Sequence, residues 1–416
     1  MAALLTLVTM VAACTNRGED APPDVVLRTP PTTTPDPDGP RPLRLGVLLP
    51  RSGVFALLGE ATTVGVDLAL EEIEAGGGVL GQPVEVIRLD SGSDANIAAS
   101  AVAELIGDDV NGVVGPASGV AGEAVLGVLG DTDVAICSPS IAAVDLGGSD
   151  PPPGLIRTMP TDELTARALG NRVAVAGHTK VAILAPDDTR GEVLTPGVVA
   201  GLGTDVEIVH DQPYDPTDIG FDDEAGVLIA SEAEALVLLA RDEGIDIIRT
   251  LRSAGFDQTI WITDQLGSPD LASQVDTDEA DLGDVRMVWA ATASSDPDFS
   301  ARFAQAAPPD TLELFAAHAH DCVLTIALAA QQAGTTDPSE FARFMAAVSR
   351  LGHPCSTWVD CRDLIAANED IDFDGASGPL DLHDGVPTGG WFETVGWTGT
   401  GTRQTLETFA YPEPAG

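Results

Sequence analysis

The order of hydrophobic and polar residues from Leu43 onward alternates between two patterns. Short apolar runs, typical of buried strands, occupy 43–50, 84–90, 110–115 and 134–137. Between them, apolar residues at helical spacing predict helices over 59–75, 94–106 and 118–129. Strands that are connected through helices form a parallel sheet with helices on both faces. This part of the chain therefore predicts a doubly wound α/β lobe.

The same pattern begins again near Lys180. It predicts strands at 180–186, 206–209, 235–240, 259–263 and 285–290, with helices over 192–202 and 245–254. The C-terminal third adds predicted helices near 311–333, 338–350 and 356–367, and a late strand at 391–397. The chain thus predicts a second α/β lobe of similar size.

The amino terminus resembles an export signal. Ala2–Ala13 is apolar but shorter than the roughly 20 residues that span a bilayer, and it ends in small residues before Cys14. This arrangement resembles a bacterial lipobox, in which the Cys receives a lipid and becomes the first mature residue. No Lys or Arg precedes the apolar run, so an ordinary start with a chance Cys is the alternative. We predict a signal peptide over 1–13 and lipidation of Cys14.

Residues 14–42 have the composition of a tether. Eight prolines lie between residues 15 and 42, which favours an extended chain of about 3 Å per residue. The expected location is the outer face of the cell membrane, with contact to the membrane only through the lipid.

Composition excludes several classes of partner. There are 65 acidic and 20 basic residues, a net charge of −45, while 44% hydrophobic residues exclude a disordered acidic chain. Nucleic acid and anionic membranes are bound through Lys and Arg, so neither is expected as a partner. The acidity fits either a high-GC genome or a saline exterior.

Four segments in order resemble type I periplasmic binding proteins of the branched-chain amino acid group. They are 45–86, which begins LGVLLPRSGVFALLGE, 113–140, which contains VVGPASG and ends in CSPS, Ile156-Arg157-Thr158 with Asp162, and 370–393, DIDFDGASGPLDLHDGVPTGGWFE. The resemblance implies two doubly wound parallel-sheet lobes joined by three crossovers. On this basis the first lobe is 43–160 plus 293–372, and the second is 161–292 plus 373–416.

The function implied by the resemblance is capture of a small polar ligand between the lobes and delivery to the permease of an ABC importer. The ligand expected is a branched-chain or related amino acid, or an amide, bound by a monomer without a cofactor. A ligand-sensing receptor with a separate signalling partner and a degenerate, non-transport member are the alternatives. An enzyme is not expected, because no nucleophile with a base and no cofactor loop in the right context is found.

The expected ligand site combines both lobes. Ser118 and Gly119 open a helix after a strand, where free N–H groups suit a carboxylate, although Ser118 is equally suited to be the helix N-cap. By the resemblance, Ser140 and Ile141 offer backbone groups, and Asp162 and Asp264 receive an ammonium group. Three positions depart from the family pattern: Ala142 replaces a Thr, Arg190 a Tyr, and Leu58 an aromatic wall. Arg190 is suited to clamp a carboxylate, or else to pair with Asp187 or Asp188.

With Cys14 lipidated, four cysteines remain, an even number that suggests two disulfides in an exported chain. Cys355 and Cys361 are six residues apart and easily bridged, which leaves Cys137 with Cys322. A buried pair of free thiols is the alternative.

Three other motifs are not expected to carry chemistry. Gly76–Gly81 matches G-x-G-x-x-G but follows a helix and precedes a strand, the reverse of a dinucleotide site. Asp370–Asp381 resembles a calcium loop, yet Pro379 and the apolar residues after it favour a turn into a strand. His318 and His320 are two apart on a helix and point to different faces, so zinc is not expected.

Overall fold

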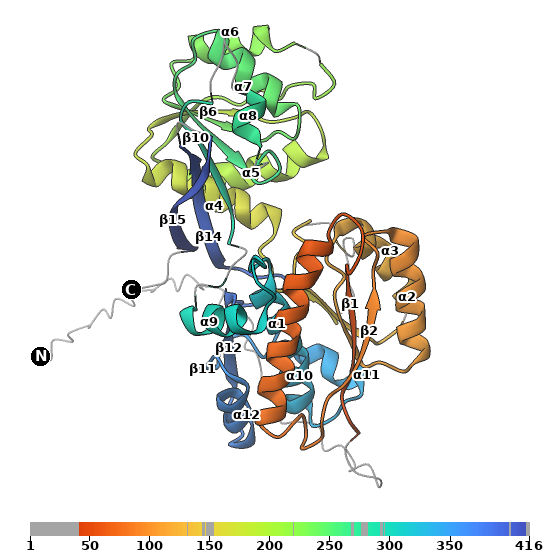
Figure 1. The fold of residues 1–416 in the computed structure, drawn as a ribbon. Coiled ribbons are helices and arrows are strands. Elements are labelled where there is room, and N and C mark those ends of the chain that lie inside the picture. The colour runs from red at the N-terminus through yellow and green to blue at the C-terminus, as the bar shows by residue number, and fades with distance from the viewer. Residues whose placement is uncertain are drawn as a thin grey trace, which may run out of the picture.

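The computed structural model describes residues 41–130, 132–143, 146, 154–218, 220–267, 270–275, 282–291, 294, 296–398 and 401–412. These form two α/β lobes, one above the other in Figure 1. The predicted signal peptide, Cys14 and nearly all of the linker lie outside the described residues. No described helix is both long and apolar enough to cross a membrane.

The first lobe is built on a parallel sheet in the order β2-β1-β3-β4-β5. Its strands are β1 Arg44–Leu49, β2 Glu85–Asp90, β3 Gly112–Val114, β4 Ala135–Ser138 and β5 Leu155–Arg157. One face packs against α1 (Ala56–Ala75) and α10 (Ala316–Ala333), and the other against α2 (Ala95–Gly107) and α3 (Gly119–Leu129). Each face has its own apolar core, as doubly wound sheets require.

The second lobe repeats that order as β7-β6-β8-β9-β10, all parallel. Its strands are β6 Lys180–Leu184, β7 Glu207–His210, β8 Ala235–Leu238, β9 Thr259–Thr263 and β10 Val285–Ala290, and its helices are α4 Asp162–Val175, α5 Thr189–Leu202, α6 Asp222–Ala230, α7 Gly244–Ser253 and α8 Leu271–Val275. Antiparallel β14 (Gly390–Trp397) and β15 (Arg403–Tyr411) extend the sheet beyond β10. The predicted fold class is confirmed.

The same close contact occurs near the start of both lobes. The first strand of each is followed by a proline, and a glycine in the next helix approaches that proline's carbonyl. A Cβ on Gly59 would lie 1.8 Å from the Pro50 oxygen, and one on Gly191 would lie 2.0 Å from the Pro186 oxygen. Only glycine allows this approach. It seats the amino ends of α1 and α5 against the carboxyl ends of β1 and β6, the edge where ligands bind in such folds.

The C-terminal third completes the first lobe. It contains α9 (Pro297–Ala306), α10, α11 (Pro338–Phe341), α12 (Trp358–Ala366) and a small sheet of β11 (His353–Cys355), β12 (Ile371–Gly375) and β13 (Gly378–Pro379). The helix predicted over 338–350 is wrong beyond Phe341, where a 3₁₀ turn (Ala342–Phe344) and further turns follow. Three apolar residues of this segment are nevertheless buried: Phe341, Met345 and Val348. The spacing of the apolar residues thus predicted which side chains contact the core but not the backbone conformation.

The chain passes between the lobes after β5, after β10 and before β14. Phe373, Leu380 and Leu382 all pack in the core of the first lobe. The predicted division at 372/373 therefore falls inside β12, and the chain returns to the second lobe only in the segment that leads to Gly390.

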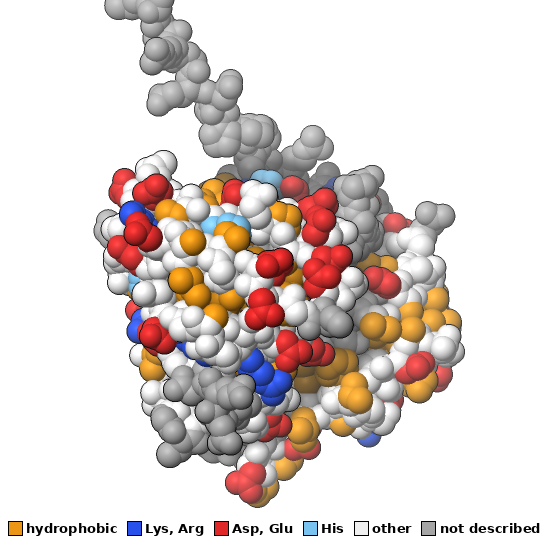
Figure 2. Space-filling model, turned by 90° about the horizontal axis from the view of Figure 1, so that it is seen from above, with side chains coloured by type: hydrophobic (Ala, Val, Ile, Leu, Met, Phe, Trp, Pro, Cys, Tyr) orange, Lys and Arg blue, Asp and Glu red, His pale blue; other side chains and the backbone are white. Residues whose placement is uncertain are grey.

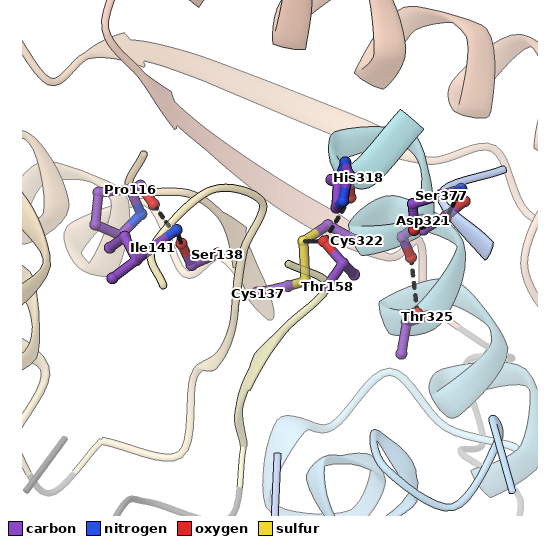
Figure 3. Close-up of a disulfide and its surroundings, with 10 residues drawn as sticks. All are labelled: Pro116, Cys137, Ser138, Ile141, Thr158, His318, Asp321, Cys322, Thr325 and Ser377. Carbon is purple, nitrogen blue, oxygen red and sulfur yellow. Dashed lines mark hydrogen bonds between the residues drawn. A yellow bond between two sulfur atoms is a disulfide. The ribbon is translucent and has the colours of Figure 1, made fainter. Parts of the chain in front are cut away.

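The structure contains both predicted disulfides. Cys137 on β4 is joined to Cys322 on α10, with a Cα–Cα distance of 5.4 Å and a sequence separation of 185. Figure 3 shows this bridge between strand and helix. Cys355 is joined to Cys361 across the short connection from β11 to α12.

The two bridges should differ in their effect on stability. Chain entropy gives about 5 kcal/mol for closing a loop of 185 residues and about 2 kcal/mol for six. We expect Cys137→Ala with Cys322→Ala to lower the free energy of unfolding more than Cys355→Ala with Cys361→Ala, in urea titrations followed by circular dichroism. Equal losses would contradict this expectation.

Candidate functional site

On the first lobe, Ser118 occupies the N-cap position of α3, with an extended backbone (φ −144°, ψ 146°). Its side chain makes no capping hydrogen bond, although serine commonly does so at this position. Ser118 is half-buried, and Gly119, the first residue of the helix, is exposed. The hydroxyl and the first N–H groups of α3 are thus directed to the same end of the helix and suit an anionic group.

The loop after β4 uses more of its polar groups internally than the sequence suggests. The Ser140 hydroxyl donates to the Ala117 carbonyl at 3.0 Å. The Ile141 N–H donates to the Ser138 hydroxyl at 3.2 Å, and the Ile141 side chain is buried. The backbone donor expected from Ile141 is therefore already occupied, and the loop acts mainly as a support for Ser118.

Asp162 lies where the two lobes meet. It is the first residue of α4, and its N–H donates to the Ala142 carbonyl at 3.0 Å. Thr161 caps the helix by accepting from the Leu164 N–H at 3.2 Å, so the helix does not require the Asp162 carboxylate as its cap. Asp162 is half-buried and bound to the first lobe through its backbone.

Arg190 lies near the start of α5 and extends toward the end of β9. Its Nη2 donates to the Thr263 hydroxyl at 3.1 Å, while its buried Nε has no hydrogen-bond partner within the described residues. Asp188 is the N-cap, accepting from the N–H groups of Arg190 and Gly191. The expected alternative of an ion pair to Asp187 or Asp188 is not found in the described part of the chain, where Asp188 faces Arg241 at 4.0 Å.

Asp162, Arg190 and Asp264 form one electrostatic cluster. Burial lowers the pKa of Arg190, and the charges of Asp162 and Asp264 oppose that shift. Asp264 lies directly after β9, and part of its surface is accessible to solvent. Desolvation by the surrounding protein, followed by the negative charge of Asp162, raises its pKa to about 6. Further charges of both signs surround these three groups, because Arg241 and Asp188 also act on Arg190, and Arg403 also acts on Asp264.

Leu58 stays a predicted site residue, and the structure shows its packing. It is partly buried and packs against the core of the first lobe. The exposed apolar residues nearby are Val54, Phe55 and Leu57. Neighbouring residues on a helix face different directions, because the helix turns every 3.6 residues. The resemblance to the family identified the position of Leu58 but not the direction in which its side chain points.

Two neighbours of the cluster were missed from the sequence. Thr263 is the hydrogen-bond partner of Arg190. Tyr214 is buried, its hydroxyl donates to Glu243 at 2.8 Å, and burial followed by that bond raises its pKa. A tyrosine shortly after a strand, in a chain with only two, was the available signal for Tyr214.

The motif at Asp370–Asp381 forms β12, a turn and β13, the strand arrangement expected from Pro379. Among the described residues, no group of three or more His, Cys, Asp or Glu side chains is placed to hold a metal ion. Figure 2, which looks down on the molecule from the top of Figure 1, shows acidic side chains spread over that face and few basic ones.

Two similar α/β lobes, three crossovers and polar residues at facing strand ends define a two-lobed substrate-binding protein. The chain belongs to the periplasmic binding protein family, whose model matches residues 42–389.

Relatives and solved structures agree with this assignment. Leu/Ile/Val-binding protein BraC3 of Rhizobium johnstonii is 27% identical over 304 residues, covering 72% of this chain and 81% of BraC3. The chemotactic signal transduction system substrate-binding protein BasB of Halobacterium salinarum is 26% identical over 395 residues, covering 88% and 90%. An ABC transporter substrate-binding protein of Desulfitobacterium hafniense, solved with Leu, has a TM-score of 0.64 at 17% identity, covering 88% of this chain and all of that one.

The like charge of Asp162 should be visible in the titration of Asp264. A carboxyl group with a raised pKa is protonated more readily in the folded state, so the folded state gains stability as pH falls through about 6 toward the unfolded value near 4. We expect Asp162→Asn to lower the pKa of Asp264 and Arg190→Gln to raise it further. Carbon-13 NMR of the carboxyl carbons tests this, and an Asp264 pKa unchanged in both variants would contradict the cluster.

Proposed function

We propose that the protein captures a small amino acid or a related amide between its lobes. The observation that carries this proposal is the opposition of charge across the site. The first lobe presents the uncapped amino end of α3 with the Ser118 hydroxyl, and the second presents Asp162 and Asp264. A zwitterion places its carboxylate on the first and its ammonium group on the second.

The two carboxylates of the site favour an ammonium group over a second anion. Asp162 and Asp264 repel one another, and a ligand cation near them would reduce that repulsion. Adding a carboxylate alone would increase the repulsion that already raises the pKa of Asp264.

Arg190 is proposed to select the rest of the ligand. Its Nη2 is engaged by Thr263, and its Nε is buried with no partner among the described residues. A ligand that carries an additional acceptor, such as a side-chain amide carbonyl, would satisfy that donor. The name of BraC3 supports amino acids as the ligand class, and Arg190 with Ala142 favours a polar relative of Leu, Ile or Val.

Delivery to an ABC importer and attachment to the outer face of the membrane complete the proposal. The lipobox-like Cys14 and the Pro-rich segment after it support the anchor. The similarity to BasB, which extends over 88% of this chain, favours a ligand-sensing receptor with a separate signalling partner as the second candidate. Both functions use the same ligand-induced closure of the lobes.

Ligand class is tested by calorimetry with Leu, Ile, Val, Gln, Asn and succinate. We expect an amino acid to bind and Asp162→Ala to abolish its binding, because the ammonium group loses its carboxylate. Ser118→Ala should weaken the same ligand by about tenfold, the loss of one hydrogen bond to a charged group. At a hundred times its dissociation constant the ligand should add about 2.7 kcal/mol to the free energy of unfolding. Binding of succinate alone, unaffected by Asp162→Ala, would contradict the proposal.

The anchor is tested by expressing the whole chain in a bacterial host that processes lipoproteins. We expect the protein to partition into detergent and Cys14→Ser to release it into the aqueous phase, because the thiol that carries the lipid is lost. Cys355→Ser with Cys361→Ser, which removes the bridge expected to contribute less to stability, serves as a control for general loss of cysteines. A wild-type protein that stays in the aqueous phase would contradict lipidation.

A further inference from the structure

A buried charge cluster lies on the far side of α10 from the ligand site. His320, on the second turn of that helix, is buried between two carboxylates. Its Nδ1 lies 2.9 Å from Asp321 Oδ1, and its Nε2 lies 3.2 Å from Glu72 Oε2 on α1. The Phe299 ring of α9 packs edge-on against the imidazole at 5.2 Å.

Asp321 is fully occupied as an acceptor. Its Oδ1 accepts from the Ala376 N–H at 2.9 Å, and its Oδ2 accepts from the Ser377 N–H at 2.7 Å and the Ser377 hydroxyl at 2.5 Å. Figure 3 shows Asp321 directed toward Ser377. Three donors from the turn therefore face the Asp321 carboxylate, and its Oδ1 is also the atom that faces His320.

Glu72 is occupied in the same way. Its Oε1 accepts from the Trp358 N–H at 2.6 Å, at the start of α12, and its Oε2 lies 3.4 Å from Arg302 Nη1 on α9. Both oxygens face donors, so Glu72 also acts as an acceptor.

A neutral imidazole has one N–H and one lone pair, and in this position the lone pair would face a carboxylate oxygen. We propose that His320 is held in the native protein as a doubly protonated imidazolium that bridges Glu72 and Asp321. We further propose that its charge holds in place the hinge, meaning the ends of the three crossovers at the first lobe. The bridge joins α1, α10 and the turn between β12 and β13.

The cluster acts on the hinge through the turn that Asp321 holds. The Ala376 carbonyl in this turn accepts from the Ser294 hydroxyl, in the crossover between β10 and α9. A Cβ on Gly378 would lie 2.4 Å from the Trp391 ring on β14, where the third crossover ends. One turn earlier on α10, the His318 carbonyl accepts from Thr158, in the first crossover, at 2.9 Å. The amino-terminal half of α10 thus contacts the first crossover directly, and the other two through the turn and β13 that Asp321 holds in place.

The surrounding charges give the direction of the pH dependence. Burial alone would lower the pKa of His320, but its bonds to Asp321 and Glu72 and their charges raise it above the ordinary value. Burial alone would raise the pKa of Glu72, and His320, the Trp358 amide and Arg302 together lower it. Asp374 on β12 faces the same region, and burial followed by the charges of neighbouring carboxylates raises its pKa to about 6. The stabilisation is therefore complete between the ordinary pKa values of Glu and His and is lost as pH rises through the raised pKa of His320.

The protonation state is read directly by nitrogen-15 NMR of the ring in histidine-labelled protein. His318, two residues away and equally buried, is an internal control, because burial lowers its pKa to about 4. We expect His320 to carry two N–H protons at pH 7 and His318 one. A neutral His320 at pH 7, or a pKa at or below the ordinary value of about 6.5, would overturn the proposal.

The link to the hinge is read by amide hydrogen exchange at Ala376 and Ser377. Glutamine cannot donate on both sides, so His320→Gln should raise exchange at these amides by about tenfold or more while amides of β9 remain protected. Thr325→Val, which removes a buried hydrogen bond from α10 without touching the Asp321 carboxylate, should leave them unchanged. Wild-type protection of Ala376 and Ser377 in a folded His320→Gln would overturn the link. If that variant does not fold, the ring titration decides.

Discussion

Helix α10 is buried along nearly its whole length, and its polar side chains must find partners without water. Sixteen of its 18 residues are buried, among them His318, His320, Asp321 and Thr325. A buried polar group left without a partner costs about 1–3 kcal/mol, and more when it is charged. His320 and Asp321 have their partners on α1 and in the turn after β12, so satisfying these two side chains places segments that are far apart in sequence.

This constraint divides the molecule into a fixed base and parts that can move. The Cys137–Cys322 bridge, the Thr158 bond and the turn held by Asp321 fix the crossovers to the first lobe. Residues of the site instead lie in loops at strand ends. The Asp162 N–H to Ala142 bond joins the two sides of the site close to the hinge. Closure of the lobes can therefore change the distance between Ser118 and Asp264 while the backbone around Asp162 stays in place.

The sequence predicted what depends on periodicity and position. Strands of the two sheets were predicted because buried parallel strands are continuous apolar runs. Ser118 and Asp264 were proposed as site residues because they follow such strands. It did not predict that the Ile141 N–H donates to the Ser138 hydroxyl, which depends on the conformation of the loop. It also did not predict that Leu58 packs against the core, which depends on contacts with other segments. The helix predicted over 338–350 failed for the same reason, since its apolar residues meet the core through turns.

The charge of −45 also bears on the ligand, through where the negative charge lies. Buried carboxylates such as Glu72 and Asp321 are compensated by His320 and by backbone donors, so the uncompensated charge lies at the surface and in the site. A surface of one sign repels ions of that sign over about a Debye length and slows their encounter at low salt. A dicarboxylate meets this repulsion outside the site and again at Asp162 and Asp264. A zwitterion carries no net charge to be repelled, and its dipole can align with the site as it enters.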